Sequence, residues 1–495
     1  MVILRRAPAQ RVGEVRLDES QQRAVDSTAA VLRVLGGPGT GKSTLAVELV
    51  VDAVSKGARA DECLVVAATR TAAGALRQRV TARLGGTSTL PLARTWQSLG
   101  FGILRAEAAL RGDPAPTLLN GPEQDAILRD LLGGHASGDA PAPIWPASVR
   151  DALATRGFRN ELRDLFMRAV EHGLGPEDLH RLGREHDRPE WVAAAQVLRE
   201  YDQVTSLSRH GSYDPAWVLT AAADVLDDVP SALARLREAV SLVVVDDAQE
   251  MTSAAARLIR VIAGGGTRIV LIGDPDSAVQ TFRGADPRFL ASAWEHLGSS
   301  VPGAGRETVV LHHGHRLPQA VAAVADRVTR RIGALGGGEQ RRFTALGSTA
   351  QVDVALLRSL AQETSHIAAV LRRAHLVEGM PWTDMAVVVR GSTRAATLRR
   401  ALAPAGVPVT AATAETPVRD EAAVRPMLAL LEEAVAVARD PGHVVDPVRV
   451  ADLVLSPIGG SDTVGLRRLR RFLRQEELAA GGGRSSDELL SELVR

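Results

Sequence analysis

Short apolar runs alternate with helical patterns along much of the chain. Each run is rich in β-branched residues and is followed by turn residues and then a helical stretch. The runs are Val31–Leu35, Leu64–Ala68, Leu242–Val245, Ile269–Ile272, Val309–Leu311, Val352–Leu357 and Met385–Val389. Runs this apolar are typical of strands buried on both faces of a parallel sheet. Because they alternate with helices, the pattern predicts an α/β fold.

Two long stretches carry only helical patterns. The expected helices are Glu123–Leu132 and Asn160–Glu171 in the first stretch, and Glu421–Val437, Val448–Leu455 and Val464–Leu478 in the second. The first stretch, about 111–210, interrupts the α/β pattern, which resumes after it. We therefore expect a helical insertion within the first α/β domain.

Composition narrows the class of protein. At ~150 residues per domain, 495 residues predict about three domains. A hydrophobic content of 45% and a net charge of +1 indicate an ordinary folded protein rather than a disordered chain or a histone-like binder of nucleic acid. Lysine occurs only at Lys42 and Lys56, a skew typical of a GC-rich genome. Any chemistry that needs a lysine therefore has two candidates.

Cysteine content and hydropathy bear on the compartment. Cys63 is the only cysteine, which excludes an intrachain disulfide and a cysteine-ligated iron–sulfur or zinc site. No apolar run reaches the ~18 residues of a membrane span. The N-terminal MVILRRAPAQRVGEV lacks the apolar core of a signal peptide. We expect a cytoplasmic protein without a membrane partner.

A phosphate loop is the clearest motif. Gly36-Gly37-Pro38-Gly39-Thr40-Gly41-Lys42-Ser43 matches G-x-x-x-x-G-K-[ST] in full, and Thr44 opens the helical run that follows. Glycines let backbone N–H groups turn toward phosphate oxygens, and the helix N-terminus adds partial positive charge. Lys42 is placed to reach the β- and γ-phosphates, and the Ser43 hydroxyl to ligate Mg²⁺. The expected cofactors are ATP and Mg²⁺.

An acidic segment supports this interpretation. The run Leu242–Val245 ends in Asp246-Asp247-Ala248-Gln249-Glu250. A strand-end Asp beside a phosphate loop holds Mg²⁺ through water, and the next carboxylate can orient the attacking water. By itself an Asp-Asp pair after a strand is more often a turn or cap. Together with the loop, it favours Asp246 as a metal ligand and Asp247 as the water-orienting group.

The order and spacing of these segments resemble superfamily 1A DNA helicases of the UvrD/Rep/PcrA type, from Leu17 to about residue 455. Within that family the chain is most similar to the AdnA-type subunit of the bacterial AdnAB helicase–nuclease. The resemblance implies a RecA-like ATP-binding lobe 1A at 1–110 and 211–300, with the helical insertion 1B at 111–210. It also implies a partial RecA-like lobe 2A at 301–412 and a helical 2B fragment at 413–495.

The resemblance also assigns nucleotide contacts. Gln21 would read the adenine edge, although Asp18 also fits the cap of a helix that starts there, and both can hold. Arg316, after three histidines whose zinc signal is weak, would be the arginine finger. Arg283 would be a further nucleotide contact. The implied catalytic residues are Lys42, Asp246, Asp247, Gln249 and Arg316.

DNA contacts are implied in three segments. Thr69 and Arg70 fall on motif Ia, Thr95 and Trp96 on motif Ib, and Phe282 follows motif III. Phe282 fits either a base-stacking ring, worth roughly 1–3 kcal/mol per base, or a buried core residue.

Four departures from the family pattern fall on functional motifs. Ala68 lacks the aromatic ring of motif Ia, Ser277 replaces a Gln of motif III, and Gly314-His315 replaces Asn-Tyr beside the finger. Asp247 replaces Glu, and a base pulled back by roughly an ångström can lose on the order of 10²-fold in rate. Together these departures suggest a weakened motor.

Motifs V and VI and a RecB-type nuclease are not found, so we expect the sequence to be the N-terminal part of a longer protein. The first hypothesis is an ATP-dependent 3′→5′ helicase and single-stranded DNA translocase in double-strand break processing and DNA repair. It would act on single-stranded and duplex DNA with an AdnB-like helicase–nuclease partner. The second is a weakly or non-catalytic ATP- and DNA-binding scaffold subunit. A P-loop kinase or GTPase is disfavoured by the ordered helicase segments.

Overall fold

The computed structural model describes residues 15–85, 93–119, 121–208, 211–297, 305–410, 424–440, 442–456 and 458–492. The chain divides into two compact units, residues 1–353 and 354–495. In the described residues, no helix is both long enough and apolar enough to span a bilayer.

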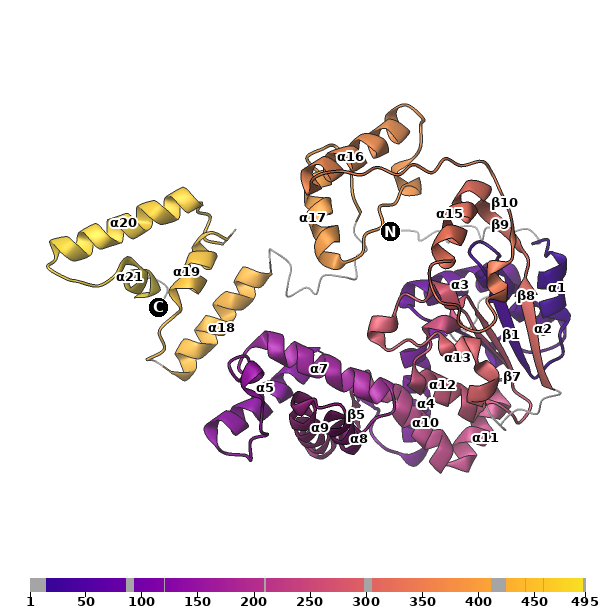
Figure 1. Cartoon of the computed structure of the whole chain (residues 1–495). Coiled ribbons are helices and arrows are strands. Elements are labelled where there is room, and N and C mark those ends of the chain that lie inside the picture. The colour runs from indigo at the N-terminus through magenta and orange to yellow at the C-terminus, as the bar shows by residue number, and fades with distance from the viewer. Residues whose placement is uncertain are drawn as a thin grey trace, which may run out of the picture. The chain divides into compact units, whose positions relative to one another are not determined.

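A parallel sheet of six strands forms the centre of the first unit (Figure 1). Its strands are β1 (Val31–Gly36), β2 (Cys63–Ala67), β3 (Ala93–Thr95), β6 (Leu242–Val245), β7 (Arg268–Gly273) and β8 (Arg306–Leu311). Their order across the sheet is β3-β2-β6-β7-β1-β8, with every pair parallel. The first five expected strands are confirmed, and so is the α/β fold.

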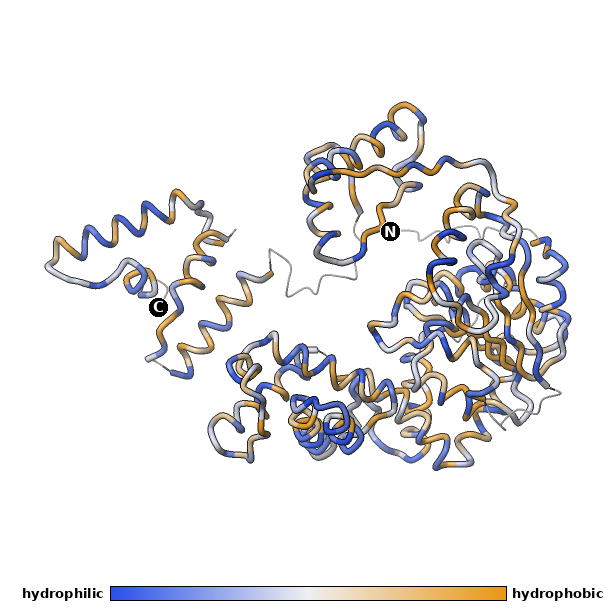
Figure 2. Tube along the Cα trace, viewed as in Figure 1, coloured by the Kyte–Doolittle hydropathy of each residue, from blue (hydrophilic) through white to orange (hydrophobic). Residues whose placement is uncertain are grey.

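Each face of this sheet is covered by its own set of helices. Val243 and Val245 of β6 pack with α4 (Trp96–Arg111), α10 (Trp217–Asp228) and α12 (Ser253–Ile262). Leu242 and Val244 pack with α1 (Glu19–Asp26), α2 (Lys42–Ser55) and α3 (Arg70–Leu84) on the other face. In Figure 2, many stretches of the tube at the centre of the first unit are coloured as hydrophobic. Burial on both faces explains why the runs are continuously apolar.

The insertion is helical, as its pattern predicts. Its helices are α5 (Gly121–Ser137), α6 (Ala147–Arg150), α7 (Arg156–Glu171), α8 (Pro176–Glu185) and α9 (Pro189–Ser208). They share a separate core that includes Leu128, Phe166 and Leu198. Two short strands that the sequence did not predict, β4 (Thr117–Leu118) and β5 (Ser212–Tyr213), pair where the chain enters and leaves the insertion.

The first sheet extends beyond residue 300, the expected end of lobe 1A, because β8 pairs with β1. After β8, strand β9 (His313–Pro318) pairs in parallel with β10 (Thr344–Gly347). The remaining helices of the first unit are α11 (Pro230–Ala239), α13 (Arg288–Ala291), α14 (Ala293–Leu297) and α15 (Gln319–Thr329). Short 3-10 helices are η2 (Ala248–Glu250), η3 (Pro275–Ser277), η4 (Thr281–Arg283) and η7 (Glu339–Arg341). The assignment of residues 301–412 to a second lobe stays a prediction.

The second unit is built from helices. They are α16 (Leu360–Leu376), α17 (Ser392–Leu402), α18 (Arg425–Arg439), α19 (Pro447–Val454), α20 (Thr463–Ala479) and α21 (Ser486–Glu492). The three helices expected there are confirmed, although residues 421–423, the start of the first, lie outside the described residues, as does the expected boundary at 412.

Two expected strands of this region, 352–357 and 385–389, are wrong. Both segments lie on the surface, where Val354 is 87% exposed and Val388 is 92% exposed. Neither forms a ladder with another strand in the part of the chain that the structure describes. An extended segment without a neighbour leaves its N–H and C=O groups unpaired, so an apolar run alone does not make a strand.

Candidate functional site

The predicted phosphate loop follows β1, and the predicted Asp246 and Asp247 follow β6. Asp274, which was not among the predicted site residues, follows the neighbouring strand β7. These strands are adjacent and parallel, so their carboxyl ends lie at one edge of the sheet. This edge is where open α/β sheets bind ligands.

The conformation of the phosphate loop is stabilised by hydrogen bonds within the loop and from helix α1. Gly39 and Gly41 have φ angles of +76° and +83°, in the left-handed region that favours glycine. The Thr40 hydroxyl donates to the carbonyl of Gly37 at 2.8 Å. The Nε2 of Gln21 donates to the Thr40 carbonyl at 3.0 Å, so Gln21 anchors the loop as well as bordering the site. Gln21 and Asp18 also form the capping box of α1, which confirms the expected cap.

A cavity of about 530 Å³ opens at this loop. It is lined by Val15, Arg16, Gln21, Gly39, Gly41, Lys42, Ser43, Thr44, Arg79, His315 and Arg316. The structure therefore brings together seven residues that the sequence predicted, with Arg316 contributed by β9. Four of the lining side chains are cationic, which suits a polyphosphate ligand.

Lys42 lies close to both carbonyls and carboxylates. Its Nζ donates to the carbonyls of Gly36 and Gly37 at 2.8 and 2.9 Å. Burial lowers the pKa of Lys42, and the carboxylates of Asp274, Asp247 and Asp246 oppose that shift. The carboxylates therefore help to keep a buried ammonium charged.

Asp246 fits the role of a metal ligand. It is buried, and its Oδ1 has no hydrogen-bond partner within the described residues. Burial raises the pKa of Asp246 to about 6, and neighbouring Asp247 adds to the shift, whereas a hydrogen bond from Ser43 opposes it. A buried carboxylate oxygen beside a hydroxyl is the donor set that Mg²⁺ takes next to a phosphate. Ser43 and Asp246 therefore fit the expected metal site.

Gln249 links the two acidic segments. Its Nε2 donates to Oδ1 of Asp247 at 3.2 Å. Its Oε1 accepts the backbone N–H of Asp274 at 3.1 Å. Ser277, at the position of the family's Gln, donates to Oδ2 of Asp274 at 2.7 Å. The hydroxyl of Ser277 is thus directed at a carboxylate of its own loop.

Strand β9 joins the site in a way that the sequence did not predict. The N–H of His315 donates to the carbonyl of Gly39 at 3.0 Å. The Nε2 of His315 lies 2.7 Å from Oδ2 of Asp18. Arg79 of α3 donates to the Thr44 hydroxyl at 2.8 Å. These contacts join residues far apart in sequence, and no local motif marks them.

The three histidines were also a weak candidate for zinc. His313 and His315 both face Asp18, at 3.7 and 2.7 Å. Across the described ranges, no group of three or more His, Cys, Asp or Glu side chains is arranged to hold a metal ion. His315 is hydrogen-bonded to the Asp18 carboxylate, and the N–H of His312 donates to the hydroxyl of Ser20 at 3.3 Å.

The predicted DNA contacts differ in their surroundings. Phe282 is 65% exposed, which favours a stacking ring over a core residue. Arg283 does not line the cavity, and its guanidinium lies 5.3 Å from the centre of the Phe282 ring. Trp96 is only 6% exposed and belongs to the core of the sheet, and its contact with DNA stays a prediction.

Thr69, Arg70 and Thr95 lie at helix starts. The hydroxyl of Thr69 accepts the N–H of Ala72 at 3.1 Å and caps α3, of which exposed Arg70 is the first residue. Thr95 caps α4 in the same way. Helix starts favour anions, so both remain suited to backbone phosphates.

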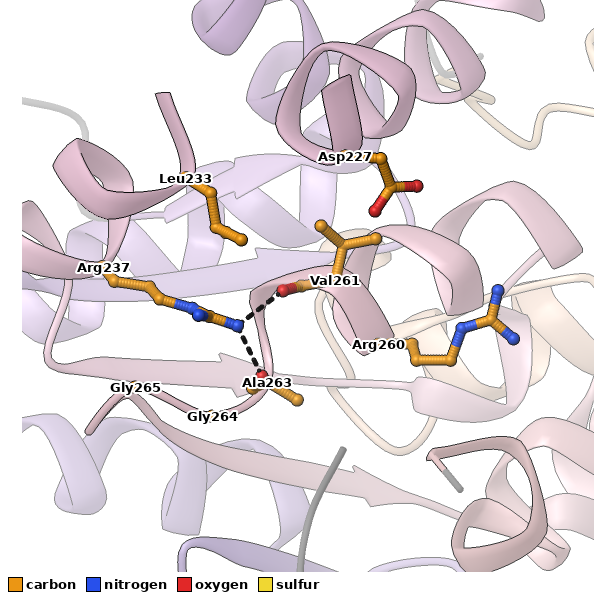
Figure 3. A pocket seen from close by; sticks show the side chains of 8 residues that line it. All are labelled: Asp227, Leu233, Arg237, Arg260, Val261, Ala263, Gly264 and Gly265. Atoms are coloured by element: carbon orange, nitrogen blue, oxygen red, sulfur yellow. Dashed lines mark hydrogen bonds between the residues drawn. The ribbon is translucent and has the colours of Figure 1, made fainter. Parts of the chain in front are cut away.

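A second hollow of about 440 Å³ lies beside α11 and α12 (Figure 3). Arg237 reaches across it and donates to the carbonyls of Val261 and Ala263, at 2.9 and 2.8 Å. These carbonyls lie at the end of α12, so Arg237 acts there as a helix cap. None of the site residues predicted from the sequence lines this hollow.

Comparison with known proteins agrees with this geometry. Residues 17–297 match the family described as the UvrD/REP helicase N-terminal domain. The chain is 23% identical over 390 residues to the ATP-dependent DNA helicase Rep of Salmonella typhimurium, covering 76% of this chain and 52% of that protein. It is 24% identical over 312 residues to DNA helicase II of Escherichia coli, covering 63% and 40%. It is 25% identical over 408 residues to UvrD2 of Mycobacterium tuberculosis, covering 79% and 54%. The chain thus spans about half the length of the curated relatives it matches.

Proposed function

This chain belongs to the UvrD/Rep helicase family, and we propose that it binds ATP with Mg²⁺ at the phosphate loop and works as part of an ATP-dependent DNA helicase. The observation that carries the proposal is the cavity in which Lys42, Ser43 and Arg316 meet. The names of the relatives support the same activity, because they include ATP-dependent DNA helicases.

The residues in and beside this cavity would have different roles toward ATP. Ser43 and Asp246 would hold Mg²⁺, which supplies positive charge to the phosphates when bound. Lys42 would exchange its bonds to the loop carbonyls for phosphate oxygens, and Arg316 would neutralise charge on the γ-phosphate. Asp247 would orient the attacking water while Gln249 holds its carboxylate.

On the DNA side, Phe282 would stack on a base of a single strand, with Thr69 and Arg70 on the backbone. Movement of 3′→5′ polarity, duplex unwinding and a role in double-strand break repair are proposed from the sequence resemblance. The same resemblance supports an AdnA-type subunit acting with an AdnB-like partner. Copurification of the two subunits tests that pairing.

A scaffold subunit that binds ATP and DNA with little turnover is the second candidate. Two observations favour it. Asp247 is one methylene shorter than the family's Glu, and Ser277 is engaged with Asp274 rather than directed at a ligand.

DNA-stimulated ATP hydrolysis by the purified chain tests the proposal. Lys42→Ala is compared with Lys56→Ala, a matched control at the only other lysine, which is 61% exposed and paired with Asp52. The motor is supported if DNA stimulates ATP hydrolysis and if this stimulation is lost in Lys42→Ala but kept in Lys56→Ala. Nucleotide binding without hydrolysis supports the scaffold, and no nucleotide binding at all contradicts both.

A further inference from the structure

Two consecutive side chains of η2 hold the loop that follows β7. Gln249 accepts the N–H of Asp274 at the start of this loop. The carboxylate of Glu250 accepts the N–H groups of Val279 and Gln280 farther along, at 2.8 and 2.9 Å. Hydrogen bonds from a backbone N–H to a carboxylate are charge-assisted, and Glu250 is buried. The two hydrogen bonds that hold this loop are therefore strong.

The held segment leads directly to the exposed tip of the loop. Val279 is 71% exposed, and Phe282, three positions farther along the chain, is 65% exposed. The N–H of Arg283 donates back to the carbonyl of Gln280 at 2.8 Å, which closes the turn that carries Phe282. The position of the Phe282 backbone is therefore set from the segment that Glu250 holds.

The other end of η2 belongs to the nucleotide site. Asp247 precedes η2 with a φ angle of +56°, and the N–H of Glu250 donates to its carbonyl at 2.9 Å. One short turn thus carries a carboxylate of the nucleotide site, Asp247, and a carboxylate that holds the Phe282 loop, Glu250. A shift of Asp247 on nucleotide binding would be passed to Glu250 through this turn.

We propose that Glu250 is a positioning residue that couples the nucleotide state at Asp247 to the placement of Phe282 against a base of single-stranded DNA. Glu250 touches neither nucleotide nor DNA in this scheme. The inference rests on the proposed function, because it assigns to that site the link between its two ligands. Coupling of this kind changes the affinity for one ligand by typically 5–150-fold when the other binds.

The experiment has an arm that needs no ligand. Hydrogen–deuterium exchange of the Val279 and Gln280 amides is compared in the wild-type chain, Glu250→Gln and Glu250→Asp. Glu295→Gln, an exposed carboxylate on α14, is the matched control. We expect slow exchange in the wild type and the control, and exchange at least about tenfold faster in Glu250→Gln. The two N–H groups bond to different oxygens of Glu250, and Gln replaces one of these oxygens with an NH2 donor. Unprotected amides in the wild type overturn the proposal.

The second arm measures coupling. The affinity for fluorescent oligo(dT) is measured with and without a non-hydrolysable ATP analogue and Mg²⁺. We expect the ratio of the two affinities to depart from one by at least about fivefold in the wild type and Glu295→Gln. It should collapse toward one in Glu250→Gln and recover in part in Glu250→Asp. A merely structural role would weaken both affinities together and leave the ratio unchanged, which overturns the proposal.

Loss of the coupling and loss of the proposed binding functions give different experimental outcomes. The coupling is overturned if the wild-type chain binds both ligands but has the same affinity for oligo(dT) with and without the analogue. That outcome leaves the proposed binding functions standing. A folded wild-type chain that binds neither overturns both. Thermal unfolding of each variant identifies loss of the fold, and Glu250→Asp, which keeps the carboxylate, serves if Glu250→Gln does not fold.

Discussion

The Oδ2 atom of Asp18 and the Nε2 atom of His315 lie 2.7 Å apart, although 297 positions separate them in the chain. Asp18 caps α1, and Gln21 of the same helix donates to the carbonyl of Thr40 in the phosphate loop. His315 also donates its N–H to Gly39. The start of α1, the phosphate loop and β9 therefore form one hydrogen-bonded unit, which places neighbouring Arg316 at the cavity.

Asp18→Asn tests the charge in this unit. Burial opposes ionisation of Asp18, but hydrogen bonds from Ser20, Gln21 and His315 outweigh it and hold the pKa of Asp18 below its ordinary value. A lowered carboxylate pKa contributes stability above the unfolded value of about 3.9, and this stability is lost as pH falls through the folded pKa. Asn can still cap α1 but carries no charge.

We expect the free energy of unfolding of Asp18→Asn, measured in urea between pH 3 and 7, to fall less on acidification than that of the wild type. Asp26→Asn, at the exposed other end of α1, serves as the control and should follow the wild-type curve. Parallel curves for wild type and Asp18→Asn would show that this carboxylate is not stabilised in the fold.

Gly37→Ala probes the contact between the phosphate loop and the segment before β10. A Cβ atom at Gly37 would lie 2.5 Å from Cε1 of Phe343 and 2.8 Å from the carbonyl oxygen of Gln340. Such overpacking typically costs about 1–3 kcal/mol. We expect a lower unfolding free energy in Gly37→Ala and partial recovery in the double variant with Phe343→Ala. Costs that simply add in the double-mutant cycle would mean that Phe343 is not the obstacle.

The sequence predicted the parts of the fold that depend on local patterns. Val31–Leu35 and the four other buried runs up to residue 311 became strands because both faces of the sheet are covered. The runs 352–357 and 385–389 have the same composition but no neighbouring strand to pair with. Strand formation depends on partners, which composition does not show.

In the candidate site, too, the predictable residues are those that a local pattern marks. Lys42, Ser43 and Asp246 were predictable because a contiguous motif or a strand end marks each of them. Arg79 and the Asp18–His315 pair were not, because tertiary packing alone brings them to the cavity. Trp96 falls on a DNA-contact motif in the sequence, yet its large apolar ring is buried in the core of the sheet.

Glu171 predicts a pH dependence of stability. It ends α7 and lies against Gly284, and burial raises its pKa to about 7 against the opposing charge of Arg168. A raised carboxyl pKa means that the folded state binds the proton more tightly. The unfolding free energy should therefore fall as pH rises from about 4.3, the ordinary value, to about 7.

Glu171→Gln should remove this dependence and gain on the order of 1–3 kcal/mol relative to the wild type above pH 7. Urea unfolding from pH 4.5 to 8 measures it, with Asp164→Asn, which is 62% exposed on the same helix, as the control. A wild-type curve as flat as that of Glu171→Gln would place the ionisation of Glu171 at its ordinary pH.

Asp247→Glu has two opposing effects: it lengthens the carboxylate side chain and it increases the strain of a left-handed backbone. The φ and ψ angles of Asp247 are +56° and +49°, a left-handed conformation that Asp tolerates better than most residues. Glu at this position would extend the carboxylate by one methylene at a cost of about 1 kcal/mol in stability. If a shortened base limits the reaction, DNA-stimulated ATP turnover should rise by up to about 10²-fold while the melting temperature falls slightly. Steady-state ATP hydrolysis with saturating oligo(dT), beside thermal unfolding, separates the two effects. A stable variant with unchanged turnover would show that the position of this carboxylate does not limit hydrolysis, and would remove one of the two observations that favour the scaffold.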